Sequence, residues 1–312
     1  MRILFAGSPD LAVPSLLSLQ KSFPVAAVLT NPDRPAGRGK QAIATPVKQK
    51  ALTLDLPVLQ PRELDRPFLE QVRAFQPELL VVVAFGRIFS KEFLELFPQG
   101  GINLHASLLP KYRGPSPITA VILSGESGTG VTVQKLAPKM DAGDILGTRS
   151  LPLTGRETAG SLSTILAGLG AELLPAILKD LEQGRVRPVA QDESRASYCR
   201  LVSKEDGRID WSAEAESIER MIRAYDPWPR AFTTFEGQRL NLLAGGVYPE
   251  SADTAGKKRG LVLAADNRYG ILVNTGAGVL YISSLQLQAR KPLDWRSFLN
   301  GQQDFIGAQL GE

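Results

Sequence analysis

With 312 residues, the chain is long enough for two domains of about 150 residues, each with its own core. Its composition, 43% hydrophobic and 22% charged residues, is that of an ordinary globular protein and excludes a disordered or fibrous chain. The net charge of +4 is modest, and the single cysteine, Cys199, excludes an internal disulfide and a thiolate metal cluster.

The first elements alternate strands with helices. An apolar run at 2–6 predicts a buried strand, Ala12–Leu19 has the apolar spacing of a helix, and Val25–Leu29 predicts a second strand. The turn Gly7–Asp10 separates the first strand from the helix. This order predicts an α/β fold with a Rossmann-like, doubly wound and mostly parallel sheet.

The alternation continues to residue 188, where we expect the first domain, 1–188, to end. Helices are predicted over 46–52, 67–75, 91–96, 118–123 and 158–178, and strands over 57–59, 79–85, 101–105, 131–136 and 145–151. Leu79–Phe85 is almost continuously apolar, as expected of a central strand that is covered on both faces.

A polar segment, 189–205, suits a linker to a second domain, 206–312. After a helix over 213–224, short alternating segments are predicted to be strands over 231–235, 240–243, 260–264, 270–274 and 278–285. Five short strands with glycine turns predict a small OB-like β-barrel.

The only histidine, His105, follows Asn103 by two residues at the end of a predicted strand. Such residues point to the same side of a strand, at the edge where open α/β sheets bind ligands. Histidine, with an ordinary pKa of about 6.5, suits acid–base chemistry near neutrality. The acidic loop Lys139–Asp144 could bring a carboxylate to the ring.

Asparagine, histidine and aspartate without an activated serine or cysteine suggest acyl transfer by direct attack, with an oxyanion held by Asn103 and His105. Two bland interpretations stay open at this point. A lone histidine is more often a structural residue, and a loop such as Asp141–Asp144 is more often a turn or a metal site.

The basic loop, residues 31–48, carries Arg34, Arg38, Lys40 and Lys48 against the single acid Asp33. Its charge is either an ordinary solvated surface or a contact for a polyanion.

The string Asn103–Gly114 (NLHASLLPKYRG), followed by Pro117–Ile118 and Met140–Leu146, closely resembles the formyltransferases that use 10-formyltetrahydrofolate. The resemblance implies three catalytic residues, Asn103, His105 and Asp141. It also implies that 10-formyltetrahydrofolate is the formyl donor and that no metal takes part. The folate site that it implies consists of Phe85, Gly86, Arg87, Ile88, Ser107, Leu108, Leu109 and Pro110.

Within this superfamily the chain is similar to the enzymes that formylate methionyl-initiator tRNA. Residues 31–40 resemble their basic insertion loop, and 209–211 and 226–229 resemble the entry to their carboxyl-terminal domain. The resemblance implies transfer to the α-amino group of methionyl-initiator tRNA through a tetrahedral oxyanion. It also implies tRNA contacts from Arg38 and Lys40 and an OB-like domain that assists tRNA binding.

The departures from the family pattern are small. Ala106 stands where glycine is frequent, Ser116 where alanine is common and Asp226 where asparagine is often found. The alternatives are a formyltransferase for a small amine, such as a sugar nucleotide or glycinamide ribonucleotide, a formyltetrahydrofolate hydrolase, or a non-enzymatic RNA-binding module. With no signal peptide and no unbroken apolar run of about 20 residues, we expect a cytoplasmic protein without membrane contact, and a monomer.

Overall fold

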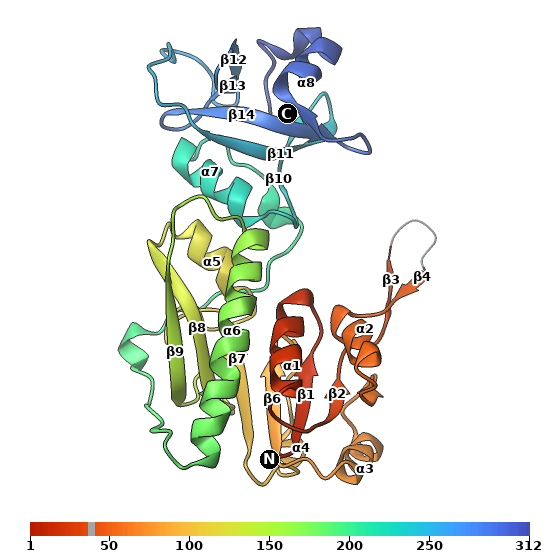
Figure 1. The fold of residues 1–312 in the computed structure, drawn as a ribbon. Coiled ribbons are helices and arrows are strands. Elements are labelled where there is room, and N and C mark those ends of the chain that lie inside the picture. Colours follow the sequence, from red (N-terminus) through yellow and green to blue (C-terminus); the bar gives the residue numbers. More distant parts are fainter. Residues whose placement is uncertain (37–40) are drawn as a thin grey trace. The chain divides into compact units, whose positions relative to one another are not determined.

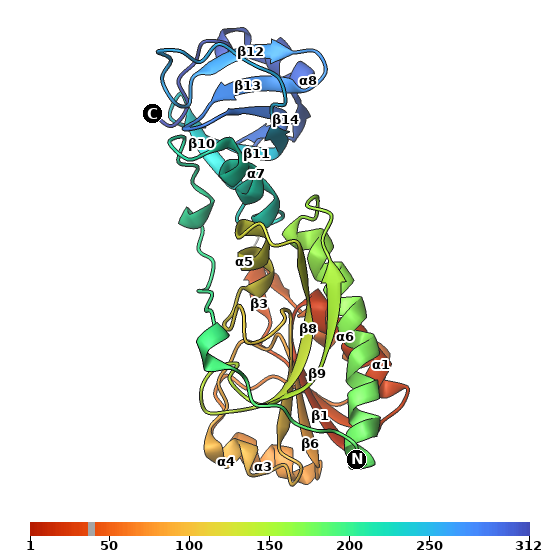
Figure 2. The same cartoon turned by 90° about the vertical axis from the view of Figure 1, so that its left-hand side faces the viewer.

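The computed structural model describes residues 1–36 and 41–312, and its contacts divide the chain into two units (Figures 1 and 2). Unit 1 consists of Met1–Pro117, Gly128–Pro152 and Ser163–Arg200, and unit 2 of Ile118–Ser127, Leu153–Leu162 and Leu201–Glu312. The domain limits suggested by the sequence stay a prediction.

Unit 1 is built on a seven-stranded sheet in the order β5-β2-β1-β6-β7-β8-β9. Its strands are β1 (Ile3–Gly7), β2 (Val25–Leu29), β5 (Val58–Leu59), β6 (Leu79–Val83), β7 (Gly101–His105), β8 (Gly128–Lys135) and β9 (Ile145–Pro152). From β5 to β7 all neighbours are parallel, whereas β8 runs antiparallel to both β7 and β9. The predicted mostly parallel, Rossmann-like sheet is confirmed.

Helices cover both faces of this sheet. They are α1 (Val13–Gln20), α2 (Pro46–Thr53), α3 (Arg66–Ala74), α4 (Lys91–Leu94) and α6 (Ala159–Glu182). Helix α5 (Pro117–Leu123) belongs to unit 2 except for its first residue. Figures 1 and 2 show α1 and α6 on one face and α3 and α4 on the other. Because both faces are covered, every residue of β1 and β6 is buried.

Helix starts follow local capping rules. Thr45, Asp65 and Ser90 each accept a backbone hydrogen bond at the N-terminus of α2, α3 and α4, from the residue three positions later. A proline follows within the first turn of α2 and α3, where its missing N–H costs nothing.

Helix α6 has 24 residues and contains an 18-residue window with a mean hydropathy of 1.6, so it is long and apolar enough by composition to cross a membrane. One such helix is weak evidence for a membrane span, because core helices of soluble proteins meet the same test. Gly170 lies directly on β7, since a Cβ there would come within 2.3 Å of the Leu104 side chain. The contact identifies α6 as a helix that packs on the sheet.

Unit 2 contains a separate antiparallel sheet in the order β10-β11-β14-β13-β12, with β15 beside β14. Its strands are β10 (Ala231–Phe235), β11 (Gln238–Val247), β12 (Val262–Asp266), β13 (Gly270–Asn274), β14 (Val279–Leu287) and β15 (Leu293–Asp294). Helices α7 (Ala215–Ala224) and α8 (Trp295–Gly301) pack on it around a core that includes Ile218, Leu240, Ile282 and Phe298. The five predicted strands are present.

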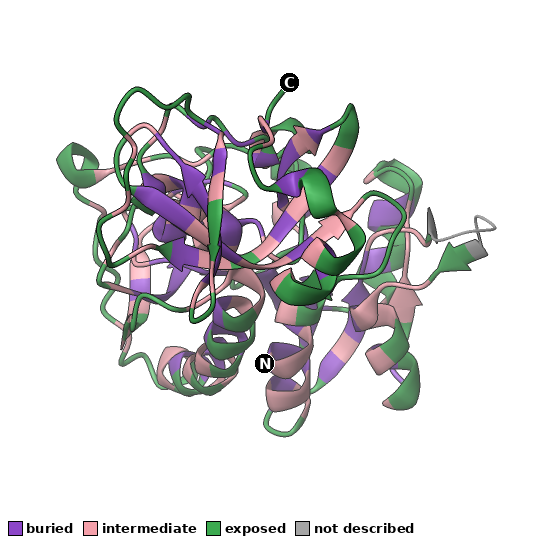
Figure 3. Ribbon diagram, turned by 90° about the horizontal axis from the view of Figure 1, so that it is seen from above, coloured by how far each residue is buried: buried purple, intermediate pink, exposed green. Residues whose placement is uncertain are grey.

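Figure 3 shows that buried residues gather in the strands and on the inner faces of the helices. Short elements complete the description: β3 (Arg34–Ala36), β4 (Gln41–Ile43) and the 3-10 helices η1 (Asp10–Ala12), η2 (Glu193–Arg195), η3 (Glu205–Gly207) and η4 (Gln303–Phe305). The hairpin β3–β4, strand β15 and helix α8 have no counterpart among the elements predicted from the sequence.

Candidate functional site

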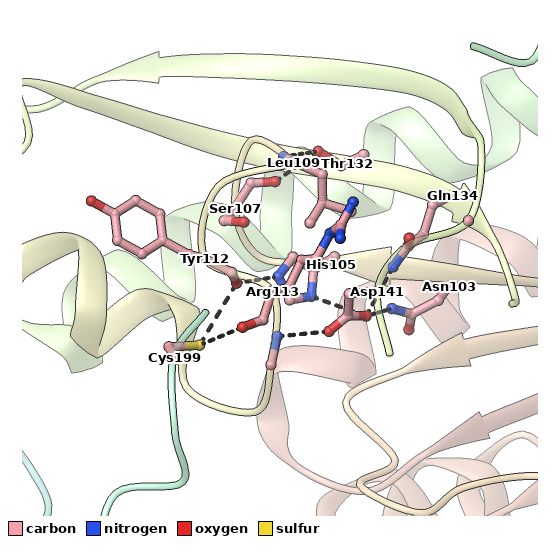
Figure 4. Close-up of polar contacts among 12 residues, drawn as sticks. Asn103, His105, Ser107, Leu109, Tyr112, Arg113, Thr132, Gln134, Asp141 and Cys199 are labelled. Atoms are coloured by element: carbon pink, nitrogen blue, oxygen red, sulfur yellow. Dashed lines mark hydrogen bonds and ion pairs between the residues drawn. The ribbon is translucent and has the colours of Figure 1, made fainter. Parts of the chain in front are cut away.

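Asn103 and His105 lie at the carboxyl end of β7, on the same side of the strand, as their spacing predicts (Figure 4). In the register of β7 with β8, Asn103 faces Gln134 and His105 faces Thr132. Asp141 lies in the turn between β8 and β9. The three residues that the sequence singles out are therefore brought together at one edge of the sheet.

The carboxylate of Asp141 accepts three hydrogen bonds. Oδ1 accepts from Asn103 Nδ2 at 3.3 Å and from Gln134 Nε2 at 2.8 Å. Oδ2 accepts from the backbone N–H of Gly114 at 2.9 Å. An ionised carboxylate only accepts hydrogen bonds, so these donors hold it in one orientation.

Gln134 was not predicted as a site residue. It is 1% exposed on β8, a strand whose other buried residues are mostly apolar or small. A polar side chain that is buried in such a strand needs a partner, and this is the signal that sequence inspection could have used.

The imidazole of His105 is held at both nitrogens and is 6% exposed. Nε2 lies 2.8 Å from the carbonyl oxygen of Tyr112, and because a carbonyl only accepts, Nε2 carries a hydrogen and donates it. Nδ1 lies 3.6 Å from Asp141 Oδ1. The ring thus presents Nδ1 to the carboxylate and to the side of the site where Asn103 lies.

The loop after β7 is fastened from within. Ser107 Oγ donates to the Lys111 carbonyl at 2.7 Å, and Thr132 Oγ1 donates to the Ser107 carbonyl and accepts from Leu109 N. The Leu109–Pro110 peptide bond is cis. Because Ser107 and Leu109 are buried, they shape this loop from inside.

Gly114 occupies a position that strongly favours glycine. Its φ is +118°, and a Cβ would lie 2.2 Å from the carbonyl oxygen of Cys199. This close approach carries the Gly114 N–H to Asp141.

The predicted folate residues after β6 lie beside the same edge, since Val83 of β6 pairs with Leu104 of β7. Phe85 is 2% exposed, and its carbonyl accepts from Asn31 Nδ2 at 2.8 Å. Gly86 has a φ of +74° and open space where a Cβ would stand. Arg87 donates to the carbonyls of Pro61 and Arg62 at 3.0 Å each, while the apolar side chain of Ile88 is 81% exposed.

The remaining predicted folate residues, Leu108 and Pro110, are half-buried in the loop after β7. They alternate there with the buried Ser107 and Leu109. Residues 85–88 and 107–110 thus follow neighbouring strands of one sheet.

In the basic loop, Lys48 pairs with Asp33 at 2.6 Å. Hydrogen bonds from Gln60 and Lys48 lower the pKa of Asp33 below its usual value. The pair leaves less of the loop's positive charge for a partner. Arg38 and Lys40, the predicted tRNA contacts, lie outside the described residues.

Cys199 lies beside the loop that follows β7, and its Sγ is 3.3 Å from the carbonyl oxygen of Arg113. Burial raises the pKa of this thiol. A protonated thiol is a poor nucleophile, in line with a site that uses no covalent cysteine intermediate. Across residues 1–36 and 41–312, no group of three or more His, Cys, Asp or Glu side chains is arranged to hold a metal ion.

Comparison with known proteins gives matches over almost the whole chain. Residues 1–178 match the formyl transferase family, and residues 201–303 match the formyl transferase C-terminal domain. A methionyl-tRNA formyltransferase of Treponema denticola is 44% identical over 316 residues, which cover 98% of each chain. A second, of Roseiflexus castenholzii, is 44% identical over 302 residues and 95% of each chain.

Among solved structures, a methionyl-tRNA formyltransferase from Clostridium thermocellum superposes with a TM-score of 0.55 at 21% identity, over 80% of this chain and 95% of its own. At that identity the likeness shows the fold alone.

Proposed function

Since the chain belongs to the methionyl-tRNA formyltransferase family, we propose that it transfers the formyl group of 10-formyltetrahydrofolate to the α-amino group of methionyl-initiator tRNA. Asn103, His105 and Asp141 carry out this transfer. The observation that supports their role is a carboxylate, Asp141, that accepts from Asn103 and lies against His105 Nδ1 at the edge of the sheet where ligands bind. No metal takes part in the proposed chemistry.

The nucleophile is the free α-amine. An α-amino group has a pKa of about 7.7, and the neighbouring ester lowers it further, so a useful neutral fraction exists at pH 7 without a strong base. The amine nitrogen bonds to the formyl carbon, whose oxygen takes up the electron pair of the broken π-bond. The carbon–N10 bond then breaks, and the proton lost by the amine ends on N10.

His105 and Asn103 are proposed to hold the developing oxyanion. The hydrogen on Nε2 is donated to the Tyr112 carbonyl, so the hydrogen available to the oxyanion is one on Nδ1. Oδ1 of Asp141 lies 3.6 Å from Nδ1, on the same side of the ring. A fixed donor of this kind contributes about 3 kcal/mol to the transition state.

Asp141 is proposed to guide the proton from the amine toward N10, directly or through water. Its carboxylate already accepts from Gln134, Asn103 and Gly114, so it keeps its place while the proton moves. This assignment separates proton transfer, given to Asp141, from stabilisation of the oxyanion, given to Asn103 and His105.

The folate is proposed to bind along residues 85–88 and 107–110. The backbone of Gly86 and Ile88 is accessible at the end of β6, where hydrogen bonds to a pterin ring can form. The exposed side chain of Ile88 offers an apolar surface that a flat ring would cover. Ser107 and Leu109 are buried, and we propose that they contribute to the folate site by fixing the loop.

The tRNA is proposed to engage Arg38 and Lys40 of the basic loop, with the C-terminal domain assisting. We also propose that the protein acts as a monomer in the cytoplasm, away from membranes.

The test is a transfer assay with 10-formyltetrahydrofolate that offers methionyl-initiator tRNA, free methionine and glycinamide ribonucleotide side by side. We expect formylation of the charged tRNA alone. Transfer to glycinamide ribonucleotide, or release of formate without transfer, would instead support one of the alternative activities.

A further inference from the structure

We propose that Gln191 is a positioning residue. Its side-chain amide links the buried guanidinium of Arg113 to the turn that carries Asp141 and holds that turn in place. The inference deepens the proposed function, because it concerns the placement of Asp141 in that same site. Gln191 belongs to residues 189–200, here called the strap, which follow α6 within unit 1.

The amide nitrogen of Gln191 holds the backbone of the turn. Nε2 donates to the carbonyl oxygen of Asp141 at 2.8 Å and to that of Gly143 at 2.7 Å. Asp141 has a φ of +51°, a conformation that an L-residue adopts only with support from its surroundings. The two hydrogen bonds from one amide provide that support.

The amide oxygen of Gln191 faces Arg113. Oε1 accepts from Nε at 3.1 Å and from Nη2 at 2.9 Å. A guanidinium only donates, so Arg113 fixes which end of the amide is oxygen and turns the nitrogen toward the carbonyls of the turn.

The side chain of Arg113 is itself held in one position. Its side chain is fully buried and also donates to Glu193 Oε1 at 2.7 Å and to the Tyr198 hydroxyl at 3.0 Å. A buried charge with several hydrogen-bonded partners has little freedom to move. All of these partners come from the strap.

The same amide also reaches the Asp141 side chain through Gln134. Gln191 Nε2 also lies 3.2 Å from Gln134 Oε1, a longer contact that shares one of its two hydrogens, and Gln134 Nε2 donates to Asp141 Oδ1 at 2.8 Å. One residue therefore orients both the backbone and the carboxylate of Asp141. Linked hydrogen bonds of this kind strengthen one another.

The strap is also paired with the segment that holds His105. Tyr112 N donates to Ser197 Oγ at 2.9 Å, and the Arg113 backbone pairs with Ser197 O and Cys199 N. Tyr112 is the residue whose carbonyl accepts from the imidazole. The strap thus fixes both partners of the His105–Asp141 pair relative to each other.

The experiment compares Gln191→Met and Gln191→Glu with a matched control, Glu193→Gln. Met removes every hydrogen bond of the amide, and Glu keeps the oxygens that face Arg113 but loses the N–H groups that hold the turn. The control changes a strap residue that also bonds to Arg113 and to the Lys139 side chain, but makes no hydrogen bond to Asp141 or Gly143.

We expect both Gln191 variants to lower kcat about 10- to 100-fold, because a small misplacement of a catalytic group costs that much. KM for 10-formyltetrahydrofolate and for methionyl-initiator tRNA should stay within about twofold, since the lost interactions act on the transition state. Glu193→Gln should keep kcat within about twofold of the unaltered protein, whatever its melting temperature. Equal losses of kcat in all three variants, in proportion to their melting temperatures, would overturn the proposal.

A second readout does not depend on activity. His105 is the only histidine, so in protein without a histidine tag its imidazole resonances are unambiguous. At one fixed pH they should shift in Gln191→Met and stay in place in Glu193→Gln. If the unaltered protein formylates no tRNA while this shift is seen, the proposed function fails and the positioning role stands. Unchanged resonances in Gln191→Met would reject the positioning role.

Discussion

At the scale of single residues, the hydrogen-bond partners of His105 and Asn103 determine what the site can bind. The Tyr112 carbonyl takes the hydrogen of His105 Nε2, and the Asp141 carboxylate has room for one on Nδ1. Asn103 is bonded to the same carboxylate oxygen that Nδ1 approaches. Asn103 Nδ2 and His105 Nδ1 therefore both face Asp141 Oδ1, and the proposed oxyanion would bind beside these two nitrogens.

The substitution Asp141→Asn removes the carboxylate charge but keeps the size of the side chain, so it tests the contribution of the charge. The amide keeps one acceptor oxygen, but its NH2 group faces either the Gly114 N–H or the donors Gln134 and Asn103. With the charge beside His105 also lost, we expect kcat to fall about 100-fold or more, as when one transition-state donor is removed. Steady-state kinetics of formyl transfer measures this.

Asp144→Asn is the control from the same loop. Asp144 is half exposed and lies 3.7 Å from Lys135, a weak surface pair. Its kcat should match that of the unaltered protein, and a comparable loss in both variants would show that general charge of the loop, and not Asp141, matters.

At the scale of elements, the site depends on close approaches between segments that are distant in the sequence. Gly114 contacts Cys199, and the strap bridges to β9 through the pair Val189–Ile145. The alternation of strands and helices was predictable because each element carries its own apolar period. The hairpin β3–β4 was not, since its prolines, glycines and charges show no such period.

The same contrast applies to the site. Asn103, His105 and Asp141 could be named from short motifs, and the polar Gln134 stood out in an apolar strand, whereas Gln191 could not be found. Gln191 acts across 50 residues on Asp141 and across 78 on Arg113, and contacts at such separation leave no local pattern. Their placement follows only from the folded sheet and the strap.

Gly114→Ala tests one of these close approaches. The added Cβ would overlap the Cys199 carbonyl, and the positive φ adds strain, so we expect a loss of stability of about 1–3 kcal/mol and a lower kcat as the N–H leaves Asp141. Chemical denaturation and kinetics measure the two effects. Gly155→Ala is the control, because Gly155 has a φ of +79° and open space around it. It should lose stability without losing kcat, and a Gly114→Ala enzyme with full kcat would contradict the role of this N–H.

The strap also predicts how stability depends on pH. Hydrogen bonds from Arg113, and then from Lys139, lower the pKa of Glu193 from 4.5 to about 2. A folded-state pKa below the unfolded value stabilises the fold above pH 4.5, and this contribution is lost as the pH falls from 4.5 toward 2. The melting temperature should therefore drop more steeply over this range in the unaltered protein than in Glu193→Gln. Parallel curves for the two proteins would contradict the ion pair.

At the scale of the whole molecule, the two units interleave along the chain. The chain passes between them repeatedly, because unit 2 takes in 118–127 and 153–162 as well as its C-terminal part. The fold class of both sheets was predictable from periodicity. The interleaving was not, because the sequence patterns of 118–127 and 153–162 do not differ from those of the unit 1 segments around them. Recognition of a large polyanionic partner calls for positive charge in addition to the catalytic edge, and the basic loop is where the sequence concentrates it.

Arg38→Ala tests that recognition. We expect a higher KM for methionyl-initiator tRNA, an unchanged KM for 10-formyltetrahydrofolate and a slope of log KM against log salt that is smaller by about one. Kinetics at several salt concentrations measure this. Arg34→Ala, which removes an exposed charge from the same loop, is the matched comparison. An Arg38→Ala enzyme with unaltered salt dependence would remove this residue from the tRNA contact.

The positions of Asp141 and Gln191 in the chain fix the order in which the two residues are synthesised. Gln191 leaves the ribosome 50 residues after Asp141, so the catalytic trio is outside the tunnel before the residue that steadies it. A nascent chain that stops at residue 188 already contains Asn103, His105 and Asp141, yet the turn at Asp141 has no amide beneath it. On the proposed role of Gln191, the Asp141 turn gains this support only after translation of a short polar segment that contains none of the three proposed catalytic side chains.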